Sequence, residues 1–408
     1  MAKSYIDKPK YVLTITLFVL LLLIAILAVS LIIAKKESED AENEEFERLI
    51  VTESSNASDA HKISEEGLKP NEANKSETAN SSSDKKLMDP CSSEEAMYNY
   101  SLNDGVKPIR YDLLLSLNAD STHFTGKLSI FVQLERRTKL IALNVGNDMD
   151  VNKCRLLSNT SEEMKTLRRP IDRIRQFFIV ETNECLSNGV YELYFEFEAK
   201  FANKNGVLKK KYFDSKRNET RHAIISNLQT ASNAFPCFES FSNDLRAKFQ
   251  IEIIHEKRFT AVSNSQLKEK EIYSKNLLIS KFEETDEAIL PSMVAVYVTE
   301  LECQDLQENE VAIAVCCTSE HIQKSTFALD LSTHFLSYFE DYFGRKCAQR
   351  KLHIFGIPGL IDVSFSRGVI AVNEHRLIRD SSWTLIDDEM NTIELISESI
   401  FETVFHLI

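Results

Sequence analysis

The segment Ala234–Glu239 (AFPCFE), followed by Leu245–Ile251 (LRAKFQI), decides the fold of this chain. In the second segment and just beyond it, apolar residues take every second position at Phe249, Ile251 and Ile253. Such alternation with β-branched and aromatic residues predicts a half-buried strand. The same spacing occurs upstream, at Leu128–Leu134 and Tyr191–Phe195, and similar runs recur until residue 320. We therefore predict a mainly β domain of about 200 residues.

After residue 320 the apolar period lengthens. A first helical face is predicted from Leu331, Phe335, Tyr338 and Tyr342. Strand-like sequence returns at residues 351–357 and 368–372. The last stretch is helical again, because apolar residues recur there at spacings of three and four, at Ile393, Ile396, Ile400, Val404 and Leu407. The β domain is thus followed by the start of an α/β or α+β domain.

The composition excludes several classes of protein. The chain has 408 residues with only 10 Gly and 8 Pro, unlike collagen, low-complexity chains or small disulfide scaffolds. Its net charge is −14, which argues against a nucleic-acid partner. The charge is uneven: residues 1–36 carry +4, residues 37–96 carry −11 and the remainder carries −7. The chain therefore divides into three unlike parts.

The first part contains a predicted membrane anchor. Residues 11–34 include no charged residue, and a helix of that length would span about 36 Å, enough for the hydrocarbon core of a bilayer. The run is longer than the apolar core of a cleaved signal peptide. Three lysines precede it and two follow before an acidic run begins, so we expect a cytoplasmic tail at residues 1–10. The rest of the chain would lie outside the cell or in a lumen, attached to the plasma membrane or another membrane of the secretory pathway.

Residues 35–98 are predicted to form a disordered acidic stalk, because they are rich in Glu, Ser, Asn and Lys and poor in aromatic residues. Six Asn-x-Ser/Thr sequences are candidates for glycosylation on an outside domain: Asn56, Asn74, Asn80, Asn99, Asn159 and Asn218. The eight cysteines can form disulfides in that compartment, but the sequence does not give their pairing. Cys316 and Cys317 lie in an apolar run and are predicted to be core residues of a strand.

These motifs together resemble the zinc aminopeptidases of the aminopeptidase N type, peptidase family M1. Ala234–Glu239 and Leu245–Ile251 are similar to the family signature AFPCFDEP…KAxFxI. Further family-like segments follow the family order at Pro108–Leu113, Phe124–Lys127, Ser292–Val298 and Tyr342–Pro358. The resemblance covers residues 100–408 and implies a saddle-like β-sandwich domain followed by a thermolysin-like catalytic domain.

The same resemblance implies a zinc site on a His-Glu-x-x-His helix, but no two of the nine histidines are four residues apart. Aligned on the last helix, the ligand and base positions fall on Glu398, Ser399 and Glu402. A shift by one residue places Ser397, Glu398 and Phe401 there instead. Neither alignment restores a pair of zinc ligands, so we expect no metal cofactor and a solvated face at Glu398 and Glu402.

The substrate positions of the family have changed as well. The family binds the free amino group of a peptide through the Glu of a Gly-Ala-Met-Glu-Asn loop, and Phe365 occupies that place here. Asp362 is an alternative carboxylate nearby. A second family residue, a Gln, falls on Ile225. Apolar side chains cannot pair with an ammonium group as a carboxylate does.

We therefore interpret the chain as a type II membrane glycoprotein with a catalytically inactive aminopeptidase-like ectodomain, which binds or displays an extracellular peptide or protein. Its domains are the tail, the bilayer-spanning anchor, the stalk, a β domain at residues 99–305 and a partial peptidase-like domain at residues 306–408. Two alternatives remain: a membrane metalloaminopeptidase that removes N-terminal residues from peptides, and a truncated product or incomplete gene prediction of a longer inactive homologue.

The topology gives a first testable prediction. If the residues after the anchor lie outside the cytosol, N-glycans should be attached to some of the six Asn sites. Digestion of the full chain from its source membrane with an endoglycosidase should lower its apparent mass. An unchanged mass, together with tryptic loss of the ectodomain from sealed microsomes, would reverse the orientation.

Overall fold

The computed structural model describes residues 105–158, 160, 162–168, 176–239, 245–308, 310–380 and 384–405. The proposed anchor at residues 11–34 and the stalk lie outside these ranges. No helix in the described ranges combines the length and apolar character needed to cross a bilayer. Residues 86–408 group as one compact unit, to which all the described elements belong.

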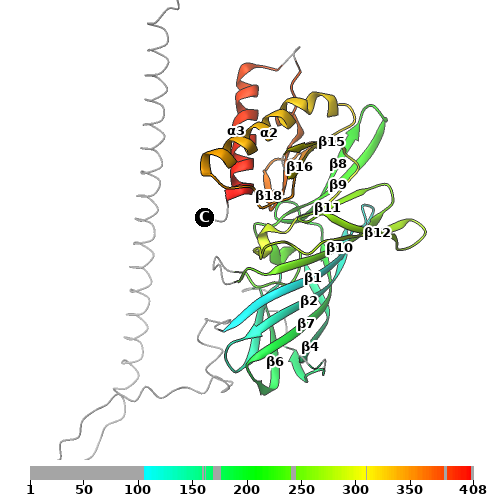
Figure 1. The fold of residues 1–408 in the computed structure, drawn as a ribbon. Helices are drawn as coiled ribbons and strands as arrows, with labels where there is room; N and C mark the ends of the chain where they lie inside the picture. The colour runs from blue at the N-terminus through cyan, green and yellow to red at the C-terminus, as the bar shows by residue number, and fades with distance from the viewer. Residues whose placement is uncertain are drawn as a thin grey trace, which may run out of the picture. The chain divides into compact units, whose positions relative to one another are not determined.

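Three sheets form the β-rich part, shown in cyan to yellow in Figure 1. A seven-stranded sheet has the order β12-β13-β10-β1-β2-β7-β4, with strands Leu267–Ile272, Leu277–Phe282, Lys248–Glu256, Val106–Ser116, His123–Leu134, Gly189–Lys200 and Met149–Ser158. A four-stranded sheet has the order β11-β14-β9-β8, with strands Thr260–Ser263, Val296–Thr299, Glu219–Asn227 and Gly206–Asp214. A three-stranded sheet has the order β3-β6-β5, with strands Thr138–Asn144, Phe177–Leu186 and Thr166–Arg168. The prediction of a mainly β domain is confirmed.

The C-terminal part contains a five-stranded sheet of order β15-β16-β17-β19-β18, with strands Glu302–Glu308, Val311–Cys317, Lys351–Ile357, Val369–Asn373 and Ser364–Ser366. The three central strands are parallel, and both edge strands are antiparallel to their neighbours. Helix α2 (Thr326–Phe343) connects β16 to β17, and α3 (Ile386–Phe405) packs beside α2. Short 3-10 helices are η1 (Ala231–Asn233), η3 (Pro291–Met293), η4 (Ile322–Ser325) and η5 (Glu374–Arg376). The predicted strands and helices of this part are present, and the domain boundary predicted at residue 305 lies inside β15.

The helical face predicted for α2 is wrong in part. Tyr338 and Tyr342 are 52% and 70% exposed, whereas Leu336 is fully buried. The polar Ser332 and Glu340 are buried as well, because Ser332 donates to a backbone carbonyl and Glu340 accepts from the Cys347 amide. Satisfied polar groups can replace apolar residues on a buried face, which a hydrophobic period does not reveal.

The segment AFPCFE lies at the centre of the main core. Phe235, Cys237 and Phe238 are fully buried. The Tyr111 ring on β1 stacks on Phe249 of β10 with centroids 4.6 Å apart, and both rings meet Phe235 edge-on. The Tyr111 hydroxyl also accepts a hydrogen bond from the Phe238 amide at 3.3 Å. Burial raises the pKa of this phenol, so it stays neutral.

This contact gives a second prediction. Tyr111→Phe keeps the stacked ring but leaves the buried Phe238 amide without its acceptor, so the free energy of unfolding should fall by about 1–2 kcal/mol. Chemical denaturation of the full chain, monitored by circular dichroism, measures the change. Tyr273→Phe is the matched control, since Tyr273 is 59% exposed and should be neutral. Equal effects of the two variants would show that the Tyr111 hydroxyl does not hold the segment.

Candidate functional site

A cleft of about 460 Å³ lies between the end of β9, the turn at η3, strand β18 and helix α3. Its lining is mostly apolar and includes two charged residues, Arg367 and Glu402. The lining residues are Asn227, Leu228, Gln229, Leu290, Ser292, Met293, Val363, Phe365, Ser366, Arg367 and Glu402. The cleft has the size and the apolar character of sites that bind small molecules or peptide side chains.

Strand β18 presents Phe365 to this cleft. Because side chains alternate along a strand, Ser364 and Ser366 point away from Phe365 and are buried. The Ser364 hydroxyl donates to the Ser226 carbonyl at 2.7 Å, and the Ser366 hydroxyl donates to the Val294 carbonyl at 3.3 Å. These bonds fix β18 on the four-stranded sheet. Phe365 remains 40% exposed on the other side.

Arg367 forms one wall of the cleft and is held from several sides. Its carbonyl accepts from the Asn264 amide group at 2.8 Å, and its amide donates to the Met293 carbonyl at 3.0 Å. Its guanidinium donates to the Glu287 carboxylate. Burial lowers the pKa of Arg367, while the charge of Glu287 acts in the opposite direction. Sequence analysis did not identify this residue. The only signal available in the sequence was its position directly after β18, the neighbour of a predicted strand-like segment.

The three positions of the expected zinc helix do not face one way. Glu398 is exposed, Ser399 is fully buried, and Glu402 lines the cleft. Of the shifted alignment, Phe401 meets Phe339 of α2 with centroids 5.8 Å apart, and Ser397 donates to the Glu394 carbonyl. Glu398 is thus exposed to solvent, and Glu402 is half-buried in the lining of the open cleft.

The structure brings only some of the predicted site residues together. Phe365 and Glu402 line the same cleft. Ile225 does not, because it lies in a separate core on β9 beside Tyr297 and Phe355. Asp362 lies outside the lining, with its carboxylate 3.5 Å from the Lys204 ammonium.

Zinc does not fit the donor atoms of this cleft. Zinc sites use nitrogen and sulfur ligands with some carboxylates, in sets of three or four. The lining contains one carboxylate, from Glu402, and neither histidine nor cysteine. Among all the described residues, no group of three or more His, Cys, Asp or Glu side chains could hold a metal ion. The lining combines an apolar ring, from Phe365, with the carboxylate of Glu402, while the Arg367 guanidinium is buried against Glu287.

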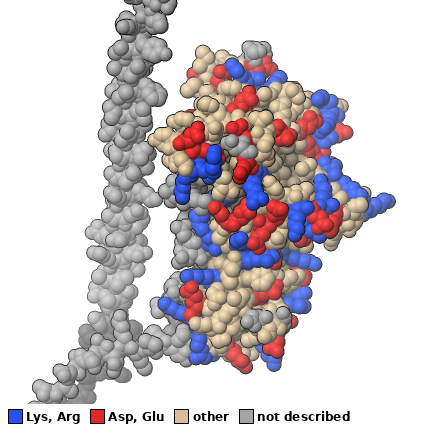
Figure 2. Space-filling view, viewed as in Figure 1, with Lys and Arg blue, Asp and Glu red and all other residues tan. Residues whose placement is uncertain are grey.

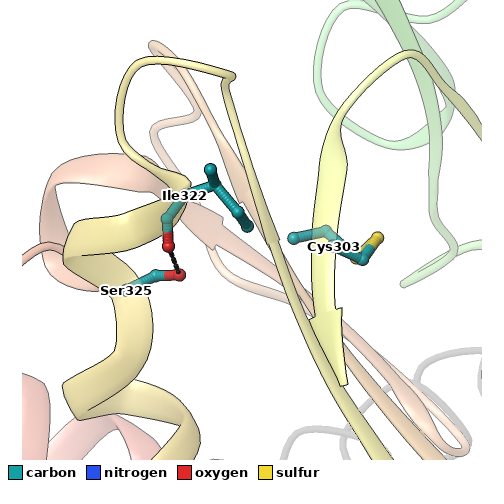
Figure 3. Close-up of a disulfide and its surroundings, with 4 residues drawn as sticks. Cys303, Ile322 and Ser325 are labelled. Carbon is teal, nitrogen blue, oxygen red and sulfur yellow. Dashed lines mark hydrogen bonds between the residues drawn. A yellow bond between two sulfur atoms is a disulfide. The ribbon is translucent and has the colours of Figure 1, made fainter.

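A disulfide and a glycosylation candidate bear on the compartment of the protein. Cys303 of β15 and Cys316 of β16 are directly opposite and form a disulfide. Figure 3 shows the Ile322 side chain of η4 extending toward the strand that carries Cys303, and the Ser325 hydroxyl donating to the Ile322 carbonyl. Both Cys316 and Cys317 are buried on β16, as predicted. The sequence did not predict that Cys316 forms a disulfide.

Of the six glycosylation candidates, Asn218 lies in the described ranges and is exposed in the turn between β8 and β9. The other five lie outside those ranges. Acidic and basic side chains are interspersed over the face drawn in Figure 2, without a large area of one sign. That surface does not favour a polyanionic partner.

Comparison with known proteins identifies relatives. Residues 107–288 match the Peptidase M1 N-terminal domain. Glutamyl aminopeptidase of Rattus norvegicus is 22% identical over 316 residues, which cover 75% of this chain and 33% of the relative. Endoplasmic reticulum aminopeptidase 1 of Mus musculus is 22% identical over 311 residues, covering 74% and 33%. Endoplasmic reticulum aminopeptidase 2 of Bos taurus is 24% identical over 307 residues, covering 72% and 31%. The chain spans about a third of the length of these curated relatives.

The anchoring of β18 gives a third prediction. Ser364→Ala removes the donor to the Ser226 carbonyl in a buried setting and should lower the free energy of unfolding by about 1–2 kcal/mol. Ser366→Ala is the matched control and should cost less, because its bond to Val294 is longer. Chemical denaturation of the full chain measures both. An equal or larger loss in Ser366→Ala would contradict the role assigned to Ser364.

Proposed function

Since the chain is a homologue of the M1 aminopeptidases, with the family's N-terminal domain at residues 107–288, we propose that it is an inactive, aminopeptidase-like binding protein. Its cleft would take an apolar residue of an extracellular peptide or protein segment. The single observation that carries this proposal is Phe365, which lies in a cleft of about 460 Å³ where the family resemblance implies a carboxylate.

The side chains that line the cleft support binding without catalysis. Hydrolysis of a peptide bond needs an activated water or nucleophile and a group that stabilises the developing negative charge. The cleft lining includes Ser292 but no histidine base, and the Ser366 hydroxyl already donates to the Val294 carbonyl. Phe365 supplies apolar contact area, and Glu402 supplies a carboxylate that can accept from a polar backbone.

We further propose that the binding module is held at the plasma membrane or another membrane of the secretory pathway through residues 11–34, with its bulk outside the cytosol. The Cys303–Cys316 disulfide supports this, since disulfides persist in oxidising compartments. The apolar length of the segment and the two relatives named after the endoplasmic reticulum are consistent with it.

The fourth prediction concerns zinc and hydrolysis. The purified full chain should retain no stoichiometric zinc after dialysis and should not hydrolyse aminoacyl-anilide substrates. Glu398→His with Ser399→Glu and Glu402→His should not rescue activity, because residue 398 faces solvent and residue 399 is buried. Elemental analysis and a chelator-controlled assay measure this. One zinc per chain with chelator-sensitive hydrolysis would replace the binding function with that of a metalloaminopeptidase.

Binding itself is tested by selecting displayed random peptides on the full chain. Peptides with an apolar anchor residue should be enriched, and their affinity should fall at least tenfold in Phe365→Asp, which places a charge in the apolar cleft. Tyr342→Asp is the matched control, because it alters an exposed aromatic residue that does not line the cleft. Failure to enrich peptides, or equal binding by Phe365→Asp, would reject the cleft as the binding site.

A further inference from the structure

Helices α2 and α3 cover the same face of the five-stranded sheet and pack against each other (Figure 1). One core holds apolar side chains of both helices and of three strands: Ala328, Leu329 and Leu336 of α2, Leu395, Ile396 and Ile400 of α3, and residues of β16, β17 and β19. Because the sheet covers only one side of each helix, side chains on the opposite side are exposed.

Four aromatic rings form a continuous exposed surface across the two helices. Phe343 of α2 and Phe401 of α3 are 36% and 41% exposed, and Tyr338 and Tyr342 of α2 are more exposed than either. The Tyr338 and Tyr342 rings stack with centroids 6.0 Å apart. The Phe343 centroid lies 4.9 Å from that of Tyr342 and 6.2 Å from that of Phe401. Adjoining exposed rings mark an interaction surface, whereas single exposed apolar residues need no explanation.

The charged side chains of these helices are acidic. Three Asp and Glu residues in α2 and six in α3 make nine, and neither helix contains Lys or Arg. Local structure explains some of them: the three in the first turn of α3 stabilise its helix dipole, and the buried Glu340 pairs with Lys346 at 2.7 Å. Glu394 and Glu398, further along α3, are exposed, and neither forms an ion pair with a described residue. Their spacing places them on one side of the helix with Phe401.

We propose that this surface binds a basic amphipathic helix of a partner protein. The surface, called here the α2–α3 face, comprises Tyr338, Asp341, Tyr342, Phe343, Glu394, Glu398 and Phe401. Apolar side chains of the partner lie on the four rings, and its Lys or Arg side chains pair with the three carboxylates. An arginine can also stack on an exposed tyrosine ring. A helix fits better than an extended segment, because the side of a helix offers no free backbone groups to a strand.

Charge argues against other occupants of the α2–α3 face. In a symmetric dimer through this face, the carboxylates of one copy would meet those of the other. Residues 37–96 carry a charge of −11, and anionic lipid headgroups are negative as well, so the face would repel both. Arg345 adds one positive charge two residues after Phe343, which leaves the carboxylates in excess. The proposal is independent of the proposed function, because no residue of the face lines the cleft.

The experiment uses the full chain in nanodiscs of zwitterionic lipid, with empty nanodiscs as the reference for binding to lipid. The probe is a fluorescent synthetic peptide of about 18 residues, with Leu on one side of the helix and Lys on the other. It should bind the chain saturably, and more weakly as the salt concentration rises. A peptide with Glu in place of Lys should not bind, and a peptide with two central prolines should bind at least about fivefold more weakly.

Charge reversal tests the acidic part of the face. Glu394→Lys with Glu398→Lys should raise the Kd of the lysine peptide at least about tenfold, because repulsion replaces attraction. Glu198→Lys with Glu283→Lys is the matched control. These two residues are exposed carboxylates outside the face, and their reversal changes the net charge by the same amount. The control should therefore bind the peptide nearly as well as the wild type does.

The rings are tested separately. Tyr338→Ser with Tyr342→Ser should raise the Kd at least about fivefold through loss of apolar contact, whereas Tyr273→Ser, at an exposed ring outside the face, should not. An equal Kd in the wild type and in the charge-reversal variant of the face would overturn the proposal. So would a wild-type chain that binds no more peptide than empty nanodiscs do, which would mean that another segment covers the face. Self-association that the ring variant abolishes would make a second copy the occupant and would also overturn it.

Discussion

The stacking of Tyr111 on Phe249, with Phe235 against both rings, is the contact on which the rest of the structure depends. Strands β1 and β10 are parallel neighbours in the seven-stranded sheet, yet more than a hundred residues separate them in sequence. Closing so long a connection costs chain entropy, which must be offset by buried area. The aromatic cluster supplies that area, and the Tyr111 hydroxyl ties the segment AFPCFE to the same point.

The position of the cleft follows from this core. The segment AFPCFE starts directly after η1, which follows β9 and the cleft residues Leu228 and Gln229. Once β9 is fixed, the Ser226 carbonyl can accept from Ser364 and set the edge strand β18. Asn264 then joins the β-rich part to the C-terminal sheet through the carbonyls of Met293 and Arg367. The cleft is thus positioned by backbone carbonyls and small polar side chains of its surroundings.

The sequence predicts the elements well where local periodicity determines them. Strand β17 has the predicted bounds at residues 351–357, and α3 contains the buried Ile396 and Ile400 of the predicted apolar face. Sequence reasoning could not predict the Cys303–Cys316 bond, because disulfide pairing depends on the register of β15 and β16. It also could not predict that Lys351 is buried. A lysine at the start of a strand normally extends to solvent, whereas Lys351 is 7% exposed and its ammonium lies 5.8 Å from the ring centroid of Phe282.

The main core and the cleft depend on different side chains. The Tyr111 cluster and the Ser364 bond involve no side chain at a position that binds zinc or substrate in the resemblance. Change at those positions therefore leaves the main core intact. A carboxylate at residue 365 would carry a desolvation cost that is offset only when a cation binds it. Phe365 carries no such cost, and its ring, which is 40% exposed, offers apolar contact area in the cleft instead.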